Sequence, residues 1–365
     1  MKSLSLQMMS NVKKTDYIIV GGGLAGMLLA WELEKRGKPF LIFSNDAPAS
    51  SNVAAGTWNP VTFRKMIPTW RSQEMINKMI EVYPEVEKKL GIKLMSLIKV
   101  EKIITNEQEA LFWEKMALTE ECKDFLEPKL KEINIKGELK KSGIVKQTGR
   151  LDLASYVKHS RTYFHNKGTL IYDSFNHSMV RVLKKGIQYN SLQVKKIIFA
   201  EGTYADQNPF FKWLPFKSVK GDILTIESKD LKVDKILKKN IFILPLGKNL
   251  YKIGATYHWW DKTWDPSNKG KMELIEKLDK ISDCTYKIIK HEAGRRPATH
   301  DRRAFMGSHP SYEDLLIFNG LGSKGVFLGP LLASEFCDFI EKKRVLDPEV
   351  SIERCIKKYF TPFKD

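Results

Sequence analysis

Cysteine, arginine and long apolar runs are scarce in this chain of 365 residues. The four cysteines are far apart and form no CxxC pair, which excludes the spacing of a zinc cluster or a disulfide framework and fits a reducing cytoplasm. The longest uncharged apolar stretch, IIVGGGLAGMLLAW, is too short to span a bilayer, and residues 1–14 lack the apolar run of a secretory signal. HExxH and GxSxG motifs are missing as well. We expect a soluble cytoplasmic protein of two connected domains, without a membrane segment or a metal site.

The basic residues are mostly lysines: 49 of the 61 are lysine and 12 are arginine, and the formal net charge is +18. Such a charge suits nucleic acid, anionic membrane or acidic metabolites as partners. The lysines are mixed with glutamates, as in EPKLKEINIKGELKK, which is typical of a solvated surface. Phosphate and base-edge recognition relies more on arginine. Two interpretations therefore stay open, a lysine-rich surface and an RNA-binding one.

A strand, a glycine turn, a helix and a second strand are predicted near the N-terminus. The apolar run YIIV leads into Gly21, Gly23 and Gly26, which form GxGxxG at the start of a helical pattern. The first glycine permits the tight turn, the second lets backbone approach a pyrophosphate, and the third lets helix and strand pack closely. Gly37 is expected to end the helix before the buried strand PFLIF. A glycine turn without a ligand is the alternative.

The second strand ends in LIFSND, where dinucleotide-binding units normally carry an acid that holds ribose hydroxyls. Ser44 occupies that place, so Asp46 or backbone must help if the ribose is held there. No arginine or lysine stands in SNDAPASS to pair with a 2′-phosphate, which argues against NADP, and the missing acid weakens NAD. The following ASSNVAAGTWNPVT is rich in small and hydroxyl residues, as needed beside a planar ligand, although an ordinary polar loop has the same composition.

Helices are predicted from about Met75 to Cys122, in INKMIEVYPEVEKKLGI and EQEALFWEKMALTEEC. Strands return in GTLIYDS, SMVRVLKKGIQY and VKKIIFAEG, and again in DILTIE, NIFILPL and LYKIGATY, before a helix in KGKMELIEKLDKI. This order predicts a discontinuous α/β domain with an inserted, mostly β, substrate domain.

Taken together, these blocks resemble the FAD-dependent amine oxidases that include D-amino-acid oxidase, glycine oxidase and sarcosine oxidase. VGGGLAGMLLAWELEKRG is similar to the FAD fingerprint of that family, SSNVAAG to its segment beside the isoalloxazine, and GRLDLASYV to the block that re-enters the flavin domain. IIFAEGTYAD, SVKGDILTIE and LYKIGATYHW are similar to later blocks, and HEAGRRPATHDRRAFMG and NGLGSKGVFLGPLLA are the most specific. The resemblance implies a Rossmann-like FAD-binding domain over residues 15–75, 145–215 and 290–365. It places an antiparallel substrate domain with helices over residues 76–144 and 216–289.

The resemblance also implies a set of site residues. Arg296 takes the place of the arginine that binds the substrate carboxylate, and Lys252 that of a lysine that promotes reaction with oxygen. A structural salt bridge with Asp301 is the alternative for Arg296, and an ordinary surface lysine is the alternative for Lys252. The residues expected to contact FAD are Gly21, Gly23, Leu24, Ala25, Gly26, Ser44, Asp46, Ser51, Asn52, Ala54, Ala55, Gly56, Ala200, Gly202, Gly322, Ser323, Lys324, Gly325, Val326 and Phe327.

Two departures from the family pattern bear on chemistry. GRRPATHD lacks the cysteine that binds flavin covalently in sarcosine oxidases, so FAD is expected to be noncovalent. Phe242 stands where glycine-oxidase-like members tend to carry a tyrosine, which weakens the case for glycine or a simple D-amino acid.

The implied activity is oxidation of a C–N bond in a small amine or amino acid, with hydride passing to the flavin and oxygen as acceptor. No side-chain base is required for it. One alternative follows from FSNDAPASSNVAAGTWNP, which resembles the oxidase domain that matures 5-methylaminomethyl-2-thiouridine in tRNA, and the net charge suits that polyanion. The other is a flavin dehydrogenase with a different electron acceptor. The oligomeric state stays open.

Overall fold

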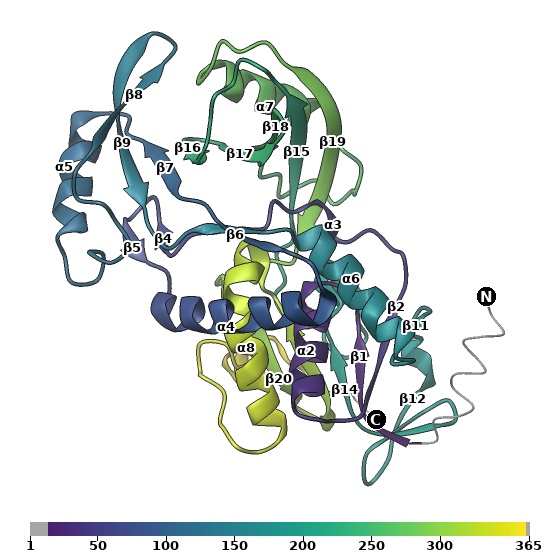
Figure 1. Ribbon diagram of the computed structural model, residues 1–365. Coiled ribbons are helices and arrows are strands. Elements are labelled where there is room, and N and C mark those ends of the chain that lie inside the picture. The colour runs from purple at the N-terminus through teal and green to yellow at the C-terminus, as the bar shows by residue number, and fades with distance from the viewer. Residues whose placement is uncertain (1–13, 363–365) are drawn as a thin grey trace.

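The computed structural model describes residues 14–362 and shows two bodies, each built around an eight-stranded sheet (Figure 1). The segment considered as a secretory signal lies outside the described residues, apart from Lys14. Within the described part of the chain, no helix combines the length and the apolar character needed to cross a bilayer.

The centre of the first sheet is parallel, in the order β11, β2, β1, β14, β21. Strand β2 is buried along its whole length, and β1, β14 and β21 are buried over their C-terminal residues. Antiparallel strands extend the sheet at β14 and β21. The strands are β1 (Lys14–Val20), β2 (Phe40–Ser44), β11 (Leu170–Tyr172), β12 (Val180–Val182), β13 (Ile187–Tyr189), β14 (Leu192–Phe199), β20 (Phe305–His309) and β21 (Tyr312–Asn319).

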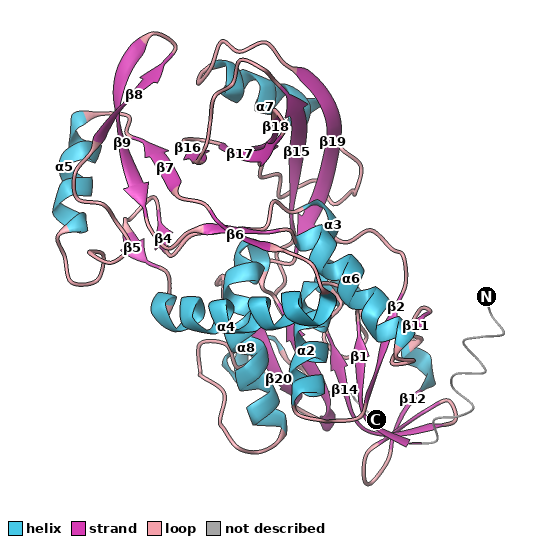
Figure 2. Ribbon diagram, in the orientation of Figure 1, coloured by secondary structure: helices cyan, strands magenta, loops and turns pink. Residues whose placement is uncertain are grey.

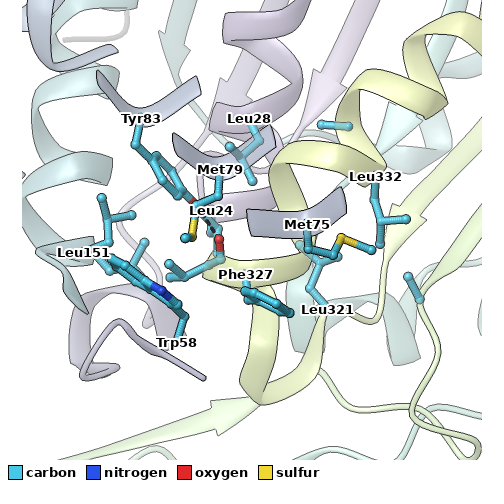
Figure 3. Close-up of a cluster of buried hydrophobic side chains, with 14 of the residues drawn as sticks. Leu24, Leu28, Trp58, Met75, Met79, Tyr83, Leu151, Leu321, Phe327 and Leu332 are labelled. Atoms are coloured by element: carbon cyan, nitrogen blue, oxygen red, sulfur yellow. Dashed lines mark hydrogen bonds between the residues drawn. The ribbon is translucent and has the colours of Figure 1, made fainter. Parts of the chain in front are cut away.

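Helices group beside this sheet, coloured cyan in Figure 2. They are α2 (Leu24–Lys35), α3 (Ser50–Val53), α4 (Ser72–Leu90), α6 (Leu153–Asn166), α8 (Gly325–Ile340) and α9 (Glu353–Tyr359). Helix α2 is apolar almost all round because it is packed between the sheet and α8, and α4 lies along α8. Figure 3 shows buried side chains of these three helices meeting: Leu24, Leu28, Met75, Met79, Tyr83, Phe327 and Leu332.

The second sheet is antiparallel except where β16 runs parallel to β7. Its order is β19 (Lys287–Arg296), β15 (Val219–Glu227), β18 (Leu250–Gly254), β17 (Phe242–Gly247), β16 (Ile236–Lys238), β7 (Val100–Ile103), β9 (Glu138–Val145) and β8 (Lys131–Ile135). Helices α5 (Glu107–Ala117) and α7 (Asn268–Asp279) lie in this upper body in Figure 1.

Smaller pieces connect the bodies. A three-stranded sheet joins β3 (Thr57–Trp58), β10 (Gly149–Leu151) and β6 (Met95–Leu97), and β4 (Val61–Thr62) pairs with β5 (Ile67–Pro68). Single 3₁₀ segments occupy His177–Met179, Gly202–Gln207 and Gly322–Lys324.

The predicted fold class is confirmed, since a parallel-centred α/β domain made of separate segments carries a mostly antiparallel second sheet. The helical prediction from Met75 to Cys122 was wrong between α4 and α5, where β6 and β7 form. Strand β7 is buried along its whole length because β16 and β9 flank it, and such distant partners leave no local signal. The expected boundary at residue 76 falls inside α4, so the division into domains stays a proposal.

Candidate active site

A cavity of about 660 Å³ lies between the two sheets. From the first sheet it receives the residues that follow the carboxyl ends of β1, β2 and β14, the edge where open α/β sheets bind ligands. From the second sheet it receives residues of β7, β15, β16, β17 and β19. Its volume is in the usual range for cofactor and small-molecule sites.

The glycine turn after β1 packs backbone against backbone. Gly21 has φ +113°, which favours glycine, and a Cβ on Gly26 would lie 1.8 Å from the Gly21 carbonyl oxygen. Gly23 caps α2 without a side-chain hydrogen bond, and Gly23, Leu24 and Ala25 at the start of the helix line the cavity. The Ser51 Oγ accepts the Leu24 N–H at 3.1 Å. An open helix N-terminus of this kind attracts an anion.

A second open helix N-terminus faces the same cavity. Residues Gly322–Lys324 form a 3₁₀ turn that leads into α8, and no side chain caps either segment. Lys324 donates to the Thr69 hydroxyl, and burial lowers its pKa to about 8, with a smaller contribution from Arg303. The cavity thus has a positive helix end on each of two sides.

The structure brings most of the expected cofactor residues into the lining. Those that line the cavity are Gly21, Gly23, Leu24, Ala25, Ser44, Ser51, Asn52, Ala54, Ala55, Gly56, Ala200, Gly202, Gly322, Ser323, Lys324, Gly325, Val326 and Phe327. Gly26 lies beneath the turn, where the third glycine of the motif was expected to allow close packing. Asp46 is not in the lining: its side chain is exposed and bonds to Arg161 at 3.1 Å.

An arginine that the sequence pattern did not suggest lies beside the end of β2. Arg161, from α6, lines the cavity beside Ser44 and packs 5.0 Å from the Tyr172 ring centroid. Its Nε is buried without a hydrogen-bond partner. Ser44 is itself buried, and its Oγ would lie 2.2 Å from a Cβ built on Gly22. Ser44, which stands where an acid was expected, is therefore a small, closely packed residue next to the cation Arg161.

Arg296 lies at the end of β19 and lines the cavity. Its Nη1 donates to the Lys220 and Thr256 carbonyl oxygens at 3.4 and 3.3 Å, and its guanidinium stands 4.2 Å from the Tyr257 ring centroid. Burial lowers its pKa, but an arginine keeps its charge in proteins. Arg296 does not form the alternative salt bridge with Asp301. The Asp301 carboxylate pairs instead with Arg354 at 2.8 Å.

Lys252 is part-buried and does not line the cavity. Its Nζ donates to the Val53 carbonyl oxygen at 3.2 Å, and Val53 does line it. Burial lowers the pKa of Lys252. The lysine therefore stands one residue behind the wall rather than on the surface.

Several lining residues of the second sheet were missed, among them Lys238, Tyr257 and Trp264. Lys238 ends a three-residue strand that carries no motif, so only long-range pairing places it. Tyr257 and Trp264 belong to the loop before α7, and the cluster of aromatics in TYHWWDKTW was the available signal. Phe242, noted as a departure from the family, also lines the cavity.

The lining fits FAD. The open N-terminus of α2 offers amides to a pyrophosphate, and the crowded glycine turn leaves backbone, not side chains, to meet it. The second open N-terminus, at α8, suits the electron-rich end of a reduced flavin. Within residues 14–362 no group of three or more His, Cys, Asp or Glu side chains is placed to hold a metal ion.

Comparisons with known proteins agree with this geometry. The family model described as DAO, FAD dependent oxidoreductase, matches residues 16–339. The chain is 24% identical over 360 residues to a glycine oxidase of Geobacillus kaustophilus, covering 90% of this chain and 93% of that enzyme. It is 23% identical to the tRNA 5-methylaminomethyl-2-thiouridine biosynthesis bifunctional protein of Leptospira interrogans, across 94% of this chain. This chain spans only 59% of the length of that bifunctional protein.

Among solved structures, the iminodiacetate oxidase of Chelativorans sp. BNC1 has the same fold, with a TM-score of 0.74 at 17% identity. The superposition covers 93% of this chain and 98% of that one. The chain belongs to the DAO family of FAD dependent oxidoreductases, and FAD is its cofactor.

Proposed function

We propose that this protein oxidises the C–N bond of an amine that carries a carboxylate, an amino acid or an N-substituted glycine. The observation that carries the proposal is Arg296, a cation in the cavity wall whose guanidinium contacts carbonyl oxygens and a ring but no carboxylate of residues 14–362. An arginine fork binds a carboxylate bidentately, and a fixed carboxylate fixes the carbon beside it. The glycine oxidases and the iminodiacetate oxidase among the related proteins support this substrate class.

When bound, FAD supplies the acceptor for a hydride from the carbon that bears nitrogen. The residues of this chain supply the rest: Arg296 orients the substrate, and the open N-terminus of α8 offers positive potential where negative charge develops. Apolar lining from Val100, Ile223 and Phe242 limits the water around the reacting carbon. Overall, an amine, water and oxygen would give a carbonyl compound, a released amine or ammonia, and hydrogen peroxide.

The test is to purify the protein with FAD and to follow bleaching of its visible absorption by a panel of carboxylated amines without oxygen. At least one should bleach it, and Arg296→Met should raise the half-saturating concentration roughly 10- to 100-fold, because a charge-assisted hydrogen-bond pair is lost. Arg303→Met, which removes an arginine whose Nε bonds to Glu349, is the matched control.

Peroxide formed in air then separates an oxidase from a dehydrogenase that needs another acceptor. A preparation that binds no FAD, or bleaching that does not depend on Arg296, would contradict the proposal.

A second candidate is oxidation of a carboxymethylaminomethyl uridine in tRNA, which the bifunctional relative suggests. One surface feature favours it. In the loop before α7, Trp259 and Trp260 are 57% and 66% exposed, and Lys269 Nζ lies 5.2 Å from the Trp260 ring centroid. Exposed aromatic rings beside cations are how proteins stack single-stranded bases. Tyr257 and Trp264 of the same loop line the cavity, so a stacked base would stand at its rim.

This candidate predicts tRNA binding that weakens steeply as salt rises, because phosphate contacts release counterions. Replacing Trp259 and Trp260 together with alanine should weaken tRNA binding and leave the bleaching rate with small amines unchanged. Absence of tRNA retention at low salt would exclude the candidate without touching the first proposal.

A further inference from the structure

The second sheet gives the cavity a mostly apolar wall that also contains a lysine. Val100, Ile236 and Phe242 line the cavity, and Lys238 stands among them. The strand register explains why these residues share one wall. Ile236 of β16 pairs with Val100 of β7, and Lys238 of β16 pairs with Phe242 of β17. Cross-strand partners share a face of the sheet, so Lys238 is carried to the cavity side with its apolar neighbours.

Lys238 has no counter-ion within residues 14–362, and neither has Arg296. The two cations line the same cavity. Burial lowers the pKa of Lys238 to about 8, with smaller contributions from the charges of Lys277 and then Arg296. Buried cations are normally paired, because an unpaired one loses hydration without compensation.

The acidic residues of the cavity lining lie at the first sheet, not at the second. Asp173 follows β11 and Glu201 follows β14, both at the edge of the first sheet. Glu201 is also engaged, since it accepts hydrogen bonds from Asn208 at 2.6 Å and lies 2.9 Å from His177 Nε2. Among the described residues, the part of the lining that comes from the second sheet therefore contains Lys238 and Arg296 but no acidic side chain.

We propose that Lys238 is a second anion-binding residue of the substrate site, and that the preferred substrate is an amine with two acidic groups. Arg296 binds the carboxylate next to the reacting carbon, and Lys238 binds a further carboxylate or a phosphate at the other end. The inference rests on the proposed function, because it uses the same cavity and the same role of Arg296. A substrate with an apolar tail would have been served better by a fully apolar wall.

The test compares three amines that share an N-carboxymethyl group, using anaerobic bleaching of the FAD-loaded protein. N-ethylglycine has one acid, iminodiacetate has a second carboxylate, and N-carboxymethyl-2-aminoethylphosphonate has a phosphonate. At least one of the two-acid amines should half-saturate the protein at a concentration roughly tenfold or more below that of N-ethylglycine. The better of the two identifies the second group as carboxylate or phosphate.

Lys238→Met should abolish this preference, and Lys238→Arg should keep most of it. Lys239→Met is the matched control, because it removes the same charge from the next residue, which does not line the cavity, and it should keep the preference. A change in half-saturation without a change in limiting rate marks a binding residue, which a merely structural lysine would not produce.

Failure of the inference and failure of the proposed function have different signatures. If N-ethylglycine saturates as readily as both two-acid amines, or if Lys238→Met keeps the preference, the inference is overturned while amine oxidation stands. If no amine bleaches the flavin, oxydiacetate and methoxyacetate serve as inert ligands, with binding read from the shift of the flavin spectrum. Tighter binding of oxydiacetate that is lost in Lys238→Met would still support the second anion site, and equal binding would overturn it.

Discussion

At the scale of single residues, Gly22 shows a constraint that the GxGxxG motif does not contain. A Cβ at this position would lie 2.2 Å from Ser44 Oγ and 2.7 Å from Ser44 Cβ. Gly22→Ala is therefore expected to weaken FAD binding by roughly tenfold or more, since overpacking costs about 1–3 kcal/mol. Titration of the apoprotein with FAD, followed by flavin fluorescence, measures the effect. Adding Ser44→Gly to the same chain should recover part of the affinity, and no recovery would show that another contact is responsible.

Cavity residues that belong to a sequence motif could be predicted, whereas cavity residues positioned only by the packing of distant elements could not. Arg296 was found because its block carries a recognisable pattern around it, and the structure places it in the cavity lining. Lys238 and Arg161 reach the same cavity from a short strand and from the middle of a helix, where nothing in the local sequence separates them from other basic residues. Asp46 was expected at the ribose from its position alone, yet its side chain is exposed and held by Arg161.

At the scale of elements, a proline explains how α4 is fixed to α8. Pro330 lies inside α8 and has no N–H to give to the carbonyl of Val326, four residues earlier. Tyr83 of α4 provides the missing donor, with its hydroxyl 2.8 Å from the Val326 oxygen, and its ring is fully buried (Figure 3). Tyr83→Phe should lower the free energy of unfolding by about 1–3 kcal/mol, because a buried carbonyl is left without a partner. Urea unfolding measures this.

The neighbouring Tyr156 is a matched control. Its ring packs against Tyr83 with 5.6 Å between centroids, it is equally buried, and its hydroxyl has no hydrogen-bond partner. Tyr156→Phe should therefore be neutral or slightly stabilising. Pro330→Ala restores an N–H, so Tyr83→Phe should cost less in that background. Equal losses in both backgrounds would argue against this explanation of the contact.

The far end of α8 predicts a pH dependence. Glu341 follows the helix, and its carboxylate pairs with Lys343, Lys38 and Arg36. The Lys343 hydrogen bond is the largest cause that lowers the pKa of Glu341, to about 2, and the hydrogen bond and charge of Lys38 add to it. A pKa lower in the folded than in the unfolded chain stabilises the fold above the unfolded pKa, near 4.3, and the stabilisation is lost as pH falls toward 2.

Glu341→Gln should thus cost about 1.5–3 kcal/mol of unfolding free energy at pH 7, the range for hydrogen bonds to charged groups. The gap between the variant and the original protein should narrow steadily between pH 5 and pH 3 in urea titrations. A gap that is constant with pH would assign the loss to packing, not charge.

Prediction was least successful for elements stabilised by distant partners. Helix α2 and strand β2 could be predicted from their own residues, because one is a continuous apolar helix after a glycine turn and the other a buried apolar run. Strands β7 and β16 are three or four residues long and depend on each other across more than a hundred positions of sequence. Those same strands bring Val100 and Lys238 to the cavity, so the substrate end was harder to predict than the cofactor end.

At the scale of the whole molecule, the cavity joins the two bodies, since residues of both sheets line it. A ligand bound only by the folded chain stabilises it by about 2.7 kcal/mol at a hundred times its dissociation constant. FAD at that excess should therefore raise the midpoint of thermal unfolding by several degrees over the apoprotein and merge any separate transitions of the two bodies. ADP serves as a control, because it offers a pyrophosphate to the N-terminus of α2 but carries no flavin that would contact the second sheet. It should raise the midpoint when it is itself present at a hundred times its dissociation constant, but it should not merge the transitions. If ADP merges them as FAD does, the second sheet is not held by the flavin, and the positions assigned to Arg296 and Lys238 beside it would have to be revised.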